Sequence, residues 1–182
     1  MAEPSDEELM AAYVGGDPAA FRALFARYAP ILLRLTIRHL RSEELAREVV
    51  QQTFFQMHAA RRDFDADKKL RPWLFTIAMN LVRGHFRQRK RRPEAPLEAV
   101  SEPAGERDDT EAPLERRQRI ERVRAAIAAL PDGQREVIVL HWFEERPFAE
   151  VAAILGSTEG AVRVRAHRAY RRLEELLDEE RE

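Results

Sequence analysis

Residues 148–172 of the chain read FAEVAAILGSTEGAVRVRAHRAYRR and contain the sharpest local signal in the sequence. Within them, Ala152, Gly156 and Val162 are separated by four and six positions. A small residue at the first position lets two helices approach, and glycine at the second permits the tight turn between them. A β-branched residue at the third packs the second helix onto the first. This spacing predicts a helix-turn-helix, two short helices joined at Gly156.

The second of these helices has two chemically different sides. The stripe that we expect to be buried consists of Val162, Ala166, Ala169, Leu173 and Leu176. The residues that point outward or flank this stripe are candidate DNA contacts: Arg163, Val164, Arg165, His167, Arg168 and Arg171. A helix with so many donors fits the major groove, where arginine can pair with guanine through two hydrogen bonds. The competing interpretation is an amphipathic helix with a solvated arginine face.

The charges of the chain are arranged in opposed blocks. The net charge of −1 argues by itself against a nucleic-acid partner. However, residues 61–92 hold eleven Lys and Arg against three Asp, and residues 147–172 hold five Arg against two Glu. Residues 93–115 and 173–182 are strongly acidic. Two separate basic blocks are typical of a protein that binds duplex DNA.

Composition limits the other classes of protein. With 45% hydrophobic residues the chain can bury a core, and its few glycines and many Ala, Leu, Arg and Glu favour helices. The lack of cysteine excludes disulfides and thiolate zinc sites. No apolar run approaches the roughly 18–20 residues of a membrane span, and the acidic N-terminus lacks a signal-peptide pattern. We therefore expect a cytoplasmic protein without membrane insertion.

Capping signals and apolar periodicity predict an all-α protein with two small helical domains. Residues 5–8 have the pattern of a capping box, and Asp17 followed by Pro18 indicates the start of a long helix. Residues 93–113 contain four prolines and no periodicity, which predicts a flexible acidic linker. The expected domains are residues 1–92 and 114–182, and the second contains the helix-turn-helix.

The end of the first domain combines basic and aromatic side chains. Six of the ten residues from 83 to 92 are basic. Cations neutralise phosphates and aromatic rings stack on unpaired bases, but a solvated helix end explains the pattern equally well. The spacing predicts a helix with two apolar sides, one with Trp73 and one with Phe75, and a polar stripe between them. Taken singly, Phe64, Trp73 and Phe75 are better explained as core residues.

No arrangement in the sequence indicates catalysis. The five histidines are scattered outside any His-Glu-x-x-His pattern, and no glycine-rich phosphate loop occurs. The Glu43-Glu44 and Glu144-Glu145 pairs are typical of a solvated surface. We expect no catalytic residue, no metal ligand and no cofactor.

Four segments of the chain have recognisable motifs: DPAAF at 17–21, VQQTF at 50–54, WLFTIAMN at 73–80, and the stretch from Leu130-Pro131 to Val162-Arg163. Together they resemble the extracytoplasmic-function (ECF) group of RNA polymerase sigma factors. Each motif is weak alone, but their order and spacing are specific and span nearly the whole chain. The resemblance implies a subunit that binds promoter DNA and the largest and second-largest subunits of core RNA polymerase. Such a subunit directs promoter recognition, −10 strand opening and transcription initiation.

The resemblance also implies roles for matching positions. The first domain would bind the −10 element, with a loop and helix that hold a flipped base and the melted strand through Phe64, Lys68, Lys69, Arg71, Trp73, Asn80, Arg83, Arg87 and Lys90. The second domain would bind the −35 element through the outward residues of the helix-turn-helix. The contact with the polymerase clamp would be an exposed face with Glu44, Glu48, Gln51, Gln52 and Phe55.

Some positions depart from the family pattern, and other classes remain open. Arg146-Pro147-Phe148 lacks the hydroxyl expected as an N-cap, and Val164 stands where serine is common. The main alternative is a stand-alone helix-turn-helix repressor or activator, although the sequence has no heptad seam for a dimer. An interaction module, such as an anti-sigma factor or adaptor, and a nucleic-acid enzyme are further alternatives. For the sigma factor we expect an anti-sigma partner, because the docking faces of a free subunit would otherwise stay available.

Overall fold

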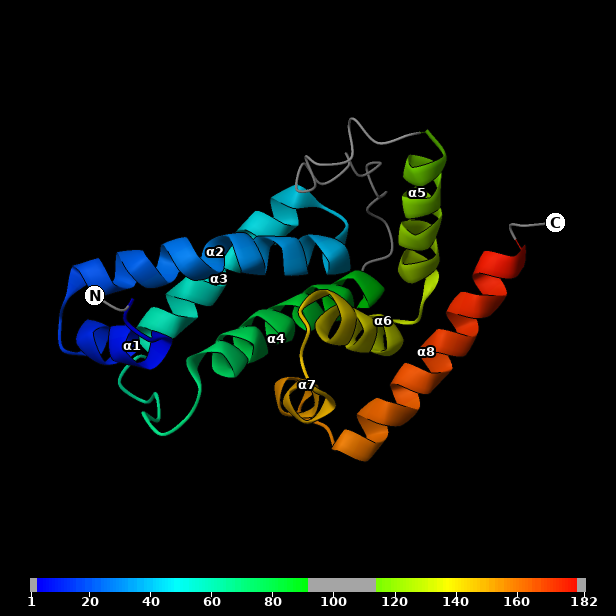
Figure 1. Cartoon of the computed structure of the whole chain (residues 1–182). Helices are drawn as coiled ribbons and strands as arrows, with labels where there is room; N and C mark the ends of the chain where they lie inside the picture. Colours follow the sequence, from blue (N-terminus) through cyan, green and yellow to red (C-terminus); the bar gives the residue numbers. More distant parts are fainter. Residues whose placement is uncertain (1–2, 92–113, 180–182) are drawn as a thin grey trace. The chain divides into compact units, whose positions relative to one another are not determined.

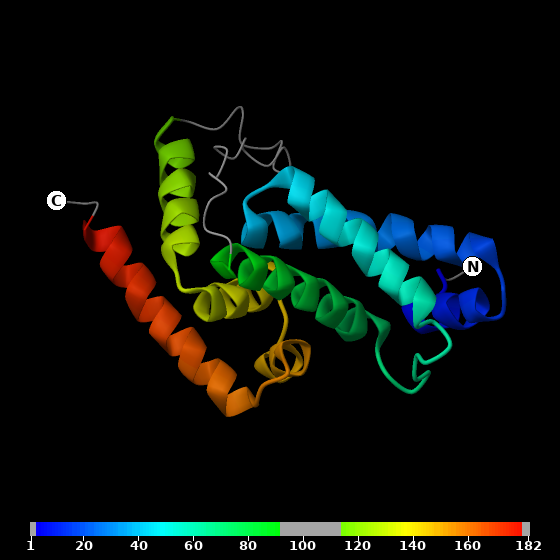
Figure 2. The same ribbon diagram turned by 180° about the vertical axis from the view of Figure 1, so that it is seen from behind.

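The chain is helical throughout the part that can be described. The computed structural model describes residues 3–91 and 114–179, and every regular element in these ranges is a helix (Figures 1 and 2). The all-α prediction is therefore confirmed. Contacts divide the chain into two units, Met1–Ser101 and Glu102–Glu182. The division falls within the predicted linker, residues 93–113, which lies outside the described residues.

The first unit begins with two capped helices. Helix α1 (Asp6–Val14) has the predicted capping box, in which the Glu8 N–H donates to Ser5 Oγ and the Ser5 N–H donates to Glu8 Oε2 at 2.7 Å. Gly16 has a φ of 100°, a left-handed conformation that favours glycine, and it turns the chain toward the next helix. Helix α2 (Pro18–Leu40) then starts at Asp17, whose carboxylate accepts the Ala19 N–H.

Helices α3 (Glu43–Ala59) and α4 (Leu70–Arg91) follow in the described part of the first unit. Ser42 caps α3 by accepting the Leu45 N–H. Helix α2 packs against α1, α3 and α4, and α4 also contacts α1 and α3. The inner side of α3 is buried along its length, at Ala46, Val49, Val50, Thr53, Phe54 and Met57. The opposite side of α3 is therefore left at the surface.

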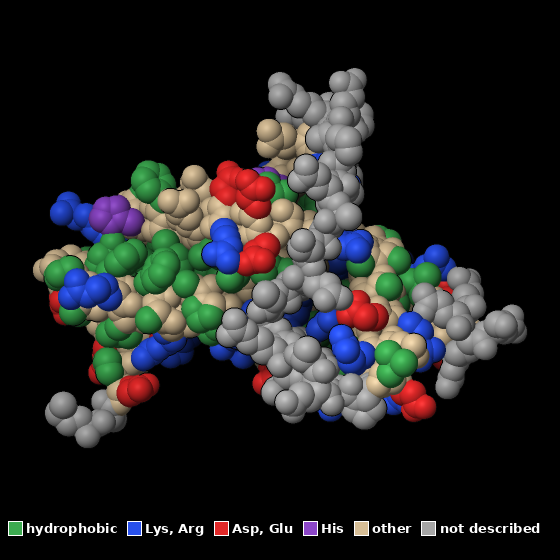
Figure 3. All heavy atoms as spheres, turned by 90° about the horizontal axis from the view of Figure 1, so that it is seen from above, with side chains coloured by type: hydrophobic (Ala, Val, Ile, Leu, Met, Phe, Trp, Pro, Cys, Tyr) green, Lys and Arg blue, Asp and Glu red, His purple; other side chains and the backbone are tan. Residues whose placement is uncertain are grey.

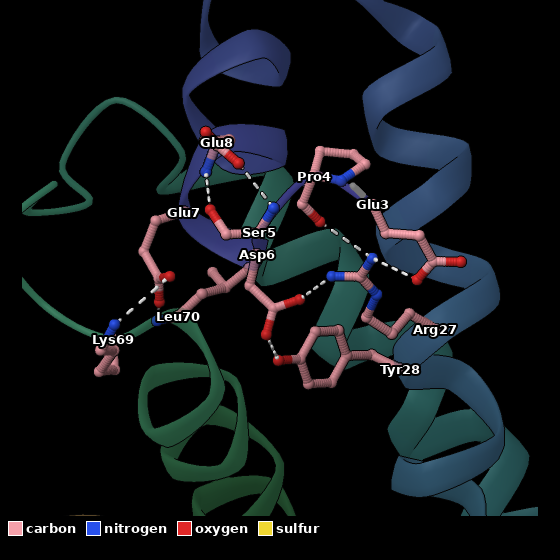
Figure 4. Close-up of polar contacts among 10 residues, drawn as sticks. All are labelled: Glu3, Pro4, Ser5, Asp6, Glu7, Glu8, Arg27, Tyr28, Lys69 and Leu70. Carbon is pink, nitrogen blue, oxygen red and sulfur yellow. Dashed lines mark hydrogen bonds and ion pairs between the residues drawn. The ribbon is translucent and has the colours of Figure 1, made fainter. Parts of the chain in front are cut away.

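Polar contacts fix α1 on α2 (Figure 4). Asp6 accepts hydrogen bonds from the Arg27 guanidinium and from the Tyr28 hydroxyl. Arg27 also donates to the carbonyl oxygen of Pro4 at 3.2 Å. Burial and the hydrogen bond to Asp6 raise the pKa of Tyr28, so its hydroxyl keeps the proton that it donates.

Within residues 114–179, the second unit contains four helices and a π-helical turn. These elements are α5 (Leu114–Ala129), α6 (Asp132–Ile138), the π-helical turn η1 (Val139–Phe143), α7 (Phe148–Leu155) and α8 (Glu159–Glu179). Arg135 of α6 donates to the Ala128 carbonyl at 2.8 Å and so links α6 to α5. Helix α8 packs against α5, α6 and α7.

Helices α7 and α8 form the predicted helix-turn-helix. Gly156 has a left-handed φ of 59°, and the Ser157 N–H donates to the Ala152 carbonyl at 2.9 Å, which closes the turn. Ala152 and Val162 are both buried, where α7 packs on α8. One expectation was wrong: α8 has 21 residues and is not short. Its apolar spacing continues to Leu176, so the helix continues past the helix-turn-helix.

Aromatic side chains meet where α1, α2 and α3 come together. The ring centroids of Phe25 and Phe54 are 4.7 Å apart, and those of Tyr13 and Phe21 are 5.1 Å apart. Phe25 nevertheless remains 45% exposed. The space-filling view shows hydrophobic side chains gathered on the surface of this unit (Figure 3).

Candidate nucleic-acid interface

The outward side of α8 carries the residues predicted to contact the −35 element. Thr158 caps the helix by accepting the Ala161 N–H at 3.2 Å. The buried residues Val162, Ala166 and Ala169 fix the rotation of the helix about its axis. The predicted contacts are Arg163, Val164, Arg165, His167, Arg168 and Arg171. All of them are exposed except Arg165, which is half-buried. The structure thus brings the whole predicted set together along one helix.

The guanidinium of Arg163 is oriented by its neighbours. It lies 4.9 Å from the centre of the Phe148 ring and donates to Glu159 at 2.6 and 3.0 Å. The Phe148 ring also stacks on His141, with centroids 4.0 Å apart. No side chain caps α7, because its N-cap residue is Pro147. The aromatic stack therefore holds the start of α7 where the sequence lacks the expected hydroxyl.

Trp142 links η1 to α8 through a hydrogen bond that the sequence pattern did not indicate. Its indole N–H donates to the hydroxyl of Tyr170 in α8 at 2.8 Å, while the side chain stays 65% exposed. Trp142 lies in η1, where the turn is wider than in an α-helix. The α-helical period of 3.6 residues therefore cannot predict which side of the helix a residue in this turn faces. The contact joins η1 to α8 between Arg168 and Arg171.

Helix α4 has one buried side, not two. Its core residues form a continuous face made of Leu70, Leu74, Phe75, Ala78, Met79 and Val82. The prediction of two apolar sides with a polar stripe between them was therefore wrong. Residues three and four positions apart are neighbours on a helix, so the two rows read from the spacing merge into one broad face. The polar stripe lies outside this face, at the surface.

The outward side of α4 brings together several predicted −10 contacts. Trp73, Asn80 and Arg87 follow one another at intervals of seven residues, or two turns, so they lie along one line of the helix. Asn80 and Arg87 are exposed, and Arg83 is half-buried. The side chain of Lys90, which was also predicted, lies outside the described residues.

The three aromatic residues predicted as core behave differently. Phe75 is fully buried and confirms the prediction, and the Arg71 guanidinium lies 5.3 Å from its ring centre. Phe64 and Trp73 are only half-buried, and their ring centroids are 5.0 Å apart. Neither ring reaches the core. Their contact with each other packs the loop against the first turn of α4.

Residues 61–69 form a loop with internal order. Asp65 accepts the Asp67 N–H through its carboxylate at 3.1 Å and the Lys68 N–H through its carbonyl at 3.0 Å. The Asp67 N–H and the nearby Lys68 lower the pKa of Asp65. The side chains of Lys68 and Lys69 are 75% and 79% exposed. The loop that contains Phe64 thus also presents two exposed cations.

The predicted polymerase contacts lie together on the outer side of α3. All of them are exposed: Glu44, Glu48, Gln51, Gln52 and Phe55. Phe55 is 67% exposed, which is unusual for a residue of this size. A face with a large apolar residue among carboxylates and amides suits binding to another protein.

The chemistry of these surfaces is that of binding. Cations suit phosphates, aromatic rings suit bases, and arginine suits base edges. Within residues 3–91 and 114–179, no group of three or more His, Asp or Glu is placed to hold a metal ion. Among the helices in the same ranges, none combines the length and apolarity that crossing a membrane requires.

Each unit matches a family of known proteins. Sigma-70 region 2 matches residues 24–92, and Sigma-70, region 4 matches residues 120–173. RNA polymerase sigma factor CarQ of Myxococcus xanthus is 36% identical over 165 residues, which cover 90% of this chain and 92% of CarQ. ECF RNA polymerase sigma factor SigM of Mycobacterium tuberculosis is 35% identical and covers 96% of this chain and 86% of its own length.

A solved structure shares the architecture. The sigma factor RpoE of Bartonella quintana, in a complex with the anti-sigma factor NepR, matches with a TM-score of 0.71 and 28% identity over 87% of this chain and 96% of that chain. The chain belongs to the ECF group of RNA polymerase sigma factors. It is a regulatory DNA-binding protein of transcription initiation, and its partners are core RNA polymerase and promoter DNA.

Proposed function

We propose that α8 reads the −35 promoter element from the major groove. The observation that carries this proposal is the division of α8 into a buried side with Val162, Ala166 and Ala169 and an outer side with exposed cations. The major groove admits one helix, and arginine there pairs with guanine. Thr158 caps the end of the helix that enters the groove in helix-turn-helix proteins.

The loop 61–69 and the outer side of α4 hold the melted non-template strand of the −10 element in this proposal. A flipped base must gain hydrogen bonds and stacking to offset the stacking lost from the duplex. The exposed amide of Asn80 and the half-exposed rings of Phe64 and Trp73 supply both. The cations of Lys68 and Arg87 suit the phosphates of the same strand.

The outer side of α3 docks on the clamp coiled coil of the largest polymerase subunit. Exposure of Phe55 supports this role, because aromatic residues are enriched where interfaces are buried. A Phe55→Ala substitution should therefore weaken binding to core polymerase and leave duplex DNA binding unchanged. Gln56→Ala is the matched control, since Gln56 is exposed on the same helix and is not among the proposed contacts.

We also propose an anti-sigma partner and a cytoplasmic site of action. RpoE, which shares the fold, is in a complex with the anti-sigma factor NepR. The free subunit of this chain exposes Phe25 and Phe55 on its first unit, and such side chains favour a partner. Residues 1–92 and 114–182 are the proposed domains, and residues 93–113 are the linker that lets them reach separated promoter elements.

Transcription by purified core RNA polymerase on a fragmented genomic template tests the whole proposal. With the protein added, we expect discrete new transcripts that start downstream of a shared two-part sequence. Loss of these transcripts with Phe55→Ala, but not with Gln56→Ala, would assign the α3 face to the polymerase. Tight duplex binding without any initiation would instead favour a stand-alone repressor or activator.

A further inference from the structure

Glu7 of α1 contacts the point where the loop 61–69 becomes α4 (Figure 4). Its Oε1 accepts the Leu70 N–H at 3.2 Å, and its Oε2 lies 3.6 Å from Lys69 Nζ. Glu7 and Leu70 are 63 positions apart in the chain, so the contact forms only when α1 is folded against α4.

The residue before α4 has no side-chain acceptor for the first N–H groups of the helix. The first N–H groups of a helix have no partner within the helix. Lys69, the residue before α4, offers none, because its ammonium group is only a donor. A carboxylate at this position also interacts favourably with the positive end of the helix dipole. The Glu7 side chain is 28% exposed, so solvent screens these interactions only in part.

Helix α1 is itself held firmly in place. The neighbouring Asp6 accepts hydrogen bonds from Arg27 and Tyr28 of α2, and the Ser5–Glu8 capping box closes the first turn. Consecutive acids thus have different partners, Asp6 on α2 and Glu7 at the start of α4 (Figure 4). Because α1 is bonded to α2 through Asp6 and to Leu70 through Glu7, the position of α1 on α2 also constrains the end of the loop.

We propose that Glu7 is a positioning residue for recognition of the −10 element. It fixes Leu70 and Lys69, and so holds the loop 61–69 in the conformation that accepts a flipped base. This inference rests on the −10 role proposed above for the loop. Glu7 does not touch the strand; it acts through the backbone of Leu70 and the ammonium group of Lys69.

Two substitutions in the full chain, assembled with core polymerase, separate these contacts. The probe is a −10 non-template strand from a promoter found by the transcription assay, and the same strand without the flipped base serves as the reference. Glu7→Ala removes both contacts. It should reduce the preference for the intact strand about fivefold if the free energy of a lost helix cap, about 1 kcal/mol, is lost from strand binding. Glu7→Gln keeps an acceptor for Leu70 but loses the ion pair, and should reduce it about twofold.

A matched control and two further readouts distinguish positioning from a general loss of structure. Glu3→Gln removes the same charge from a side chain that is 94% exposed and should leave the preference unchanged. Affinity for a −35 duplex and for core polymerase should stay unchanged in every Glu7 variant. On a Lys69→Ala background, Glu7→Gln should have no further effect, because the partner of the lost charge is gone.

Three outcomes would overturn the inference. An unchanged strand preference in Glu7→Ala would show that the contact positions nothing. Equal losses on the −10 strand and the −35 duplex would show a general structural role. If the unsubstituted holoenzyme does not prefer the intact strand, the −10 role of the loop is wrong and the role of Glu7 falls with it.

Discussion

Replacing Phe148 by leucine tests whether the aromatic stack prepares Arg163 for DNA. The substitution keeps apolar volume but removes the ring that lies 4.9 Å from the Arg163 guanidinium. A cation–π contact at such an exposed site contributes about 0.5–1 kcal/mol. If that contact holds Arg163 ready for the −35 duplex, its loss should weaken binding by about two- to fivefold. Glu159 still holds the guanidinium by two hydrogen bonds, so a larger loss is not expected.

Fluorescence anisotropy with a −35 duplex measures this effect in a double-mutant cycle. Phe148→Leu and Arg163→Ala should together cost less than the sum of their separate effects, because both remove the same contact. Phe148→Tyr keeps the ring and should bind like the unsubstituted protein. The reasoning is refuted if Phe148→Leu binds normally, or if the two substitutions add without coupling.

The remaining predictions concern the recognition helix, its turn and the first cap. Arg168→Ala should cost about 1–3 kcal/mol on the cognate −35 sequence if Arg168 reads a base; equal weakening on all sequences would make it a phosphate contact. Gly156→Ala should destabilise the second unit by about 1 kcal/mol in urea unfolding, since φ is 59° and no atom lies within 4 Å to clash. Gly133→Ala, with equal space and no left-handed φ, is its control and should not destabilise. The Ser5 backbone N–H lowers the pKa of Glu8 from its ordinary 4.5, so its stabilising effect is complete above pH 4.5 and is lost as pH falls through the folded-state pKa. Glu8→Gln should therefore flatten the acid side of the thermal stability curve, and an unchanged curve would contradict this.

Local chemistry was enough to predict where the first two helices begin and the rotation of α8. Ser5 and Asp17 cap helices through contacts within three residues, and a short segment of sequence contains both partners. The helix-turn-helix follows for the same reason, because Gly156 and the residues it separates lie within eleven positions. Exposure of the predicted DNA contacts on α8 then follows from its buried stripe.

Contacts between distant segments could not be predicted in this way. Glu7 looks like one of several acids in the first turn of α1, and only the fold brings it to Leu70. The stack of His141, Phe148 and Arg163 also joins three elements, so no single periodicity contains it. Trp73 was assigned to the core because the spacing allowed it, but the fold pairs its ring with Phe64 at the surface.

The two proposed DNA surfaces share a physical device. On each, a cation proposed to meet DNA is already paired with a carboxylate of the protein: Lys69 with Glu7, and Arg163 with Glu159. Such a cation has a preferred orientation before DNA arrives, but a phosphate must compete with the carboxylate for it. It therefore adds less to the sequence-independent affinity, which comes from neutralising phosphates and releasing counterions. A paired cation thus favours a promoter site that it fits over DNA of arbitrary sequence. The net charge of −1 acts in the same direction, because it gives the chain little overall attraction to DNA. Replacing Glu159 with Gln should then steepen the salt dependence of binding to non-promoter duplex DNA.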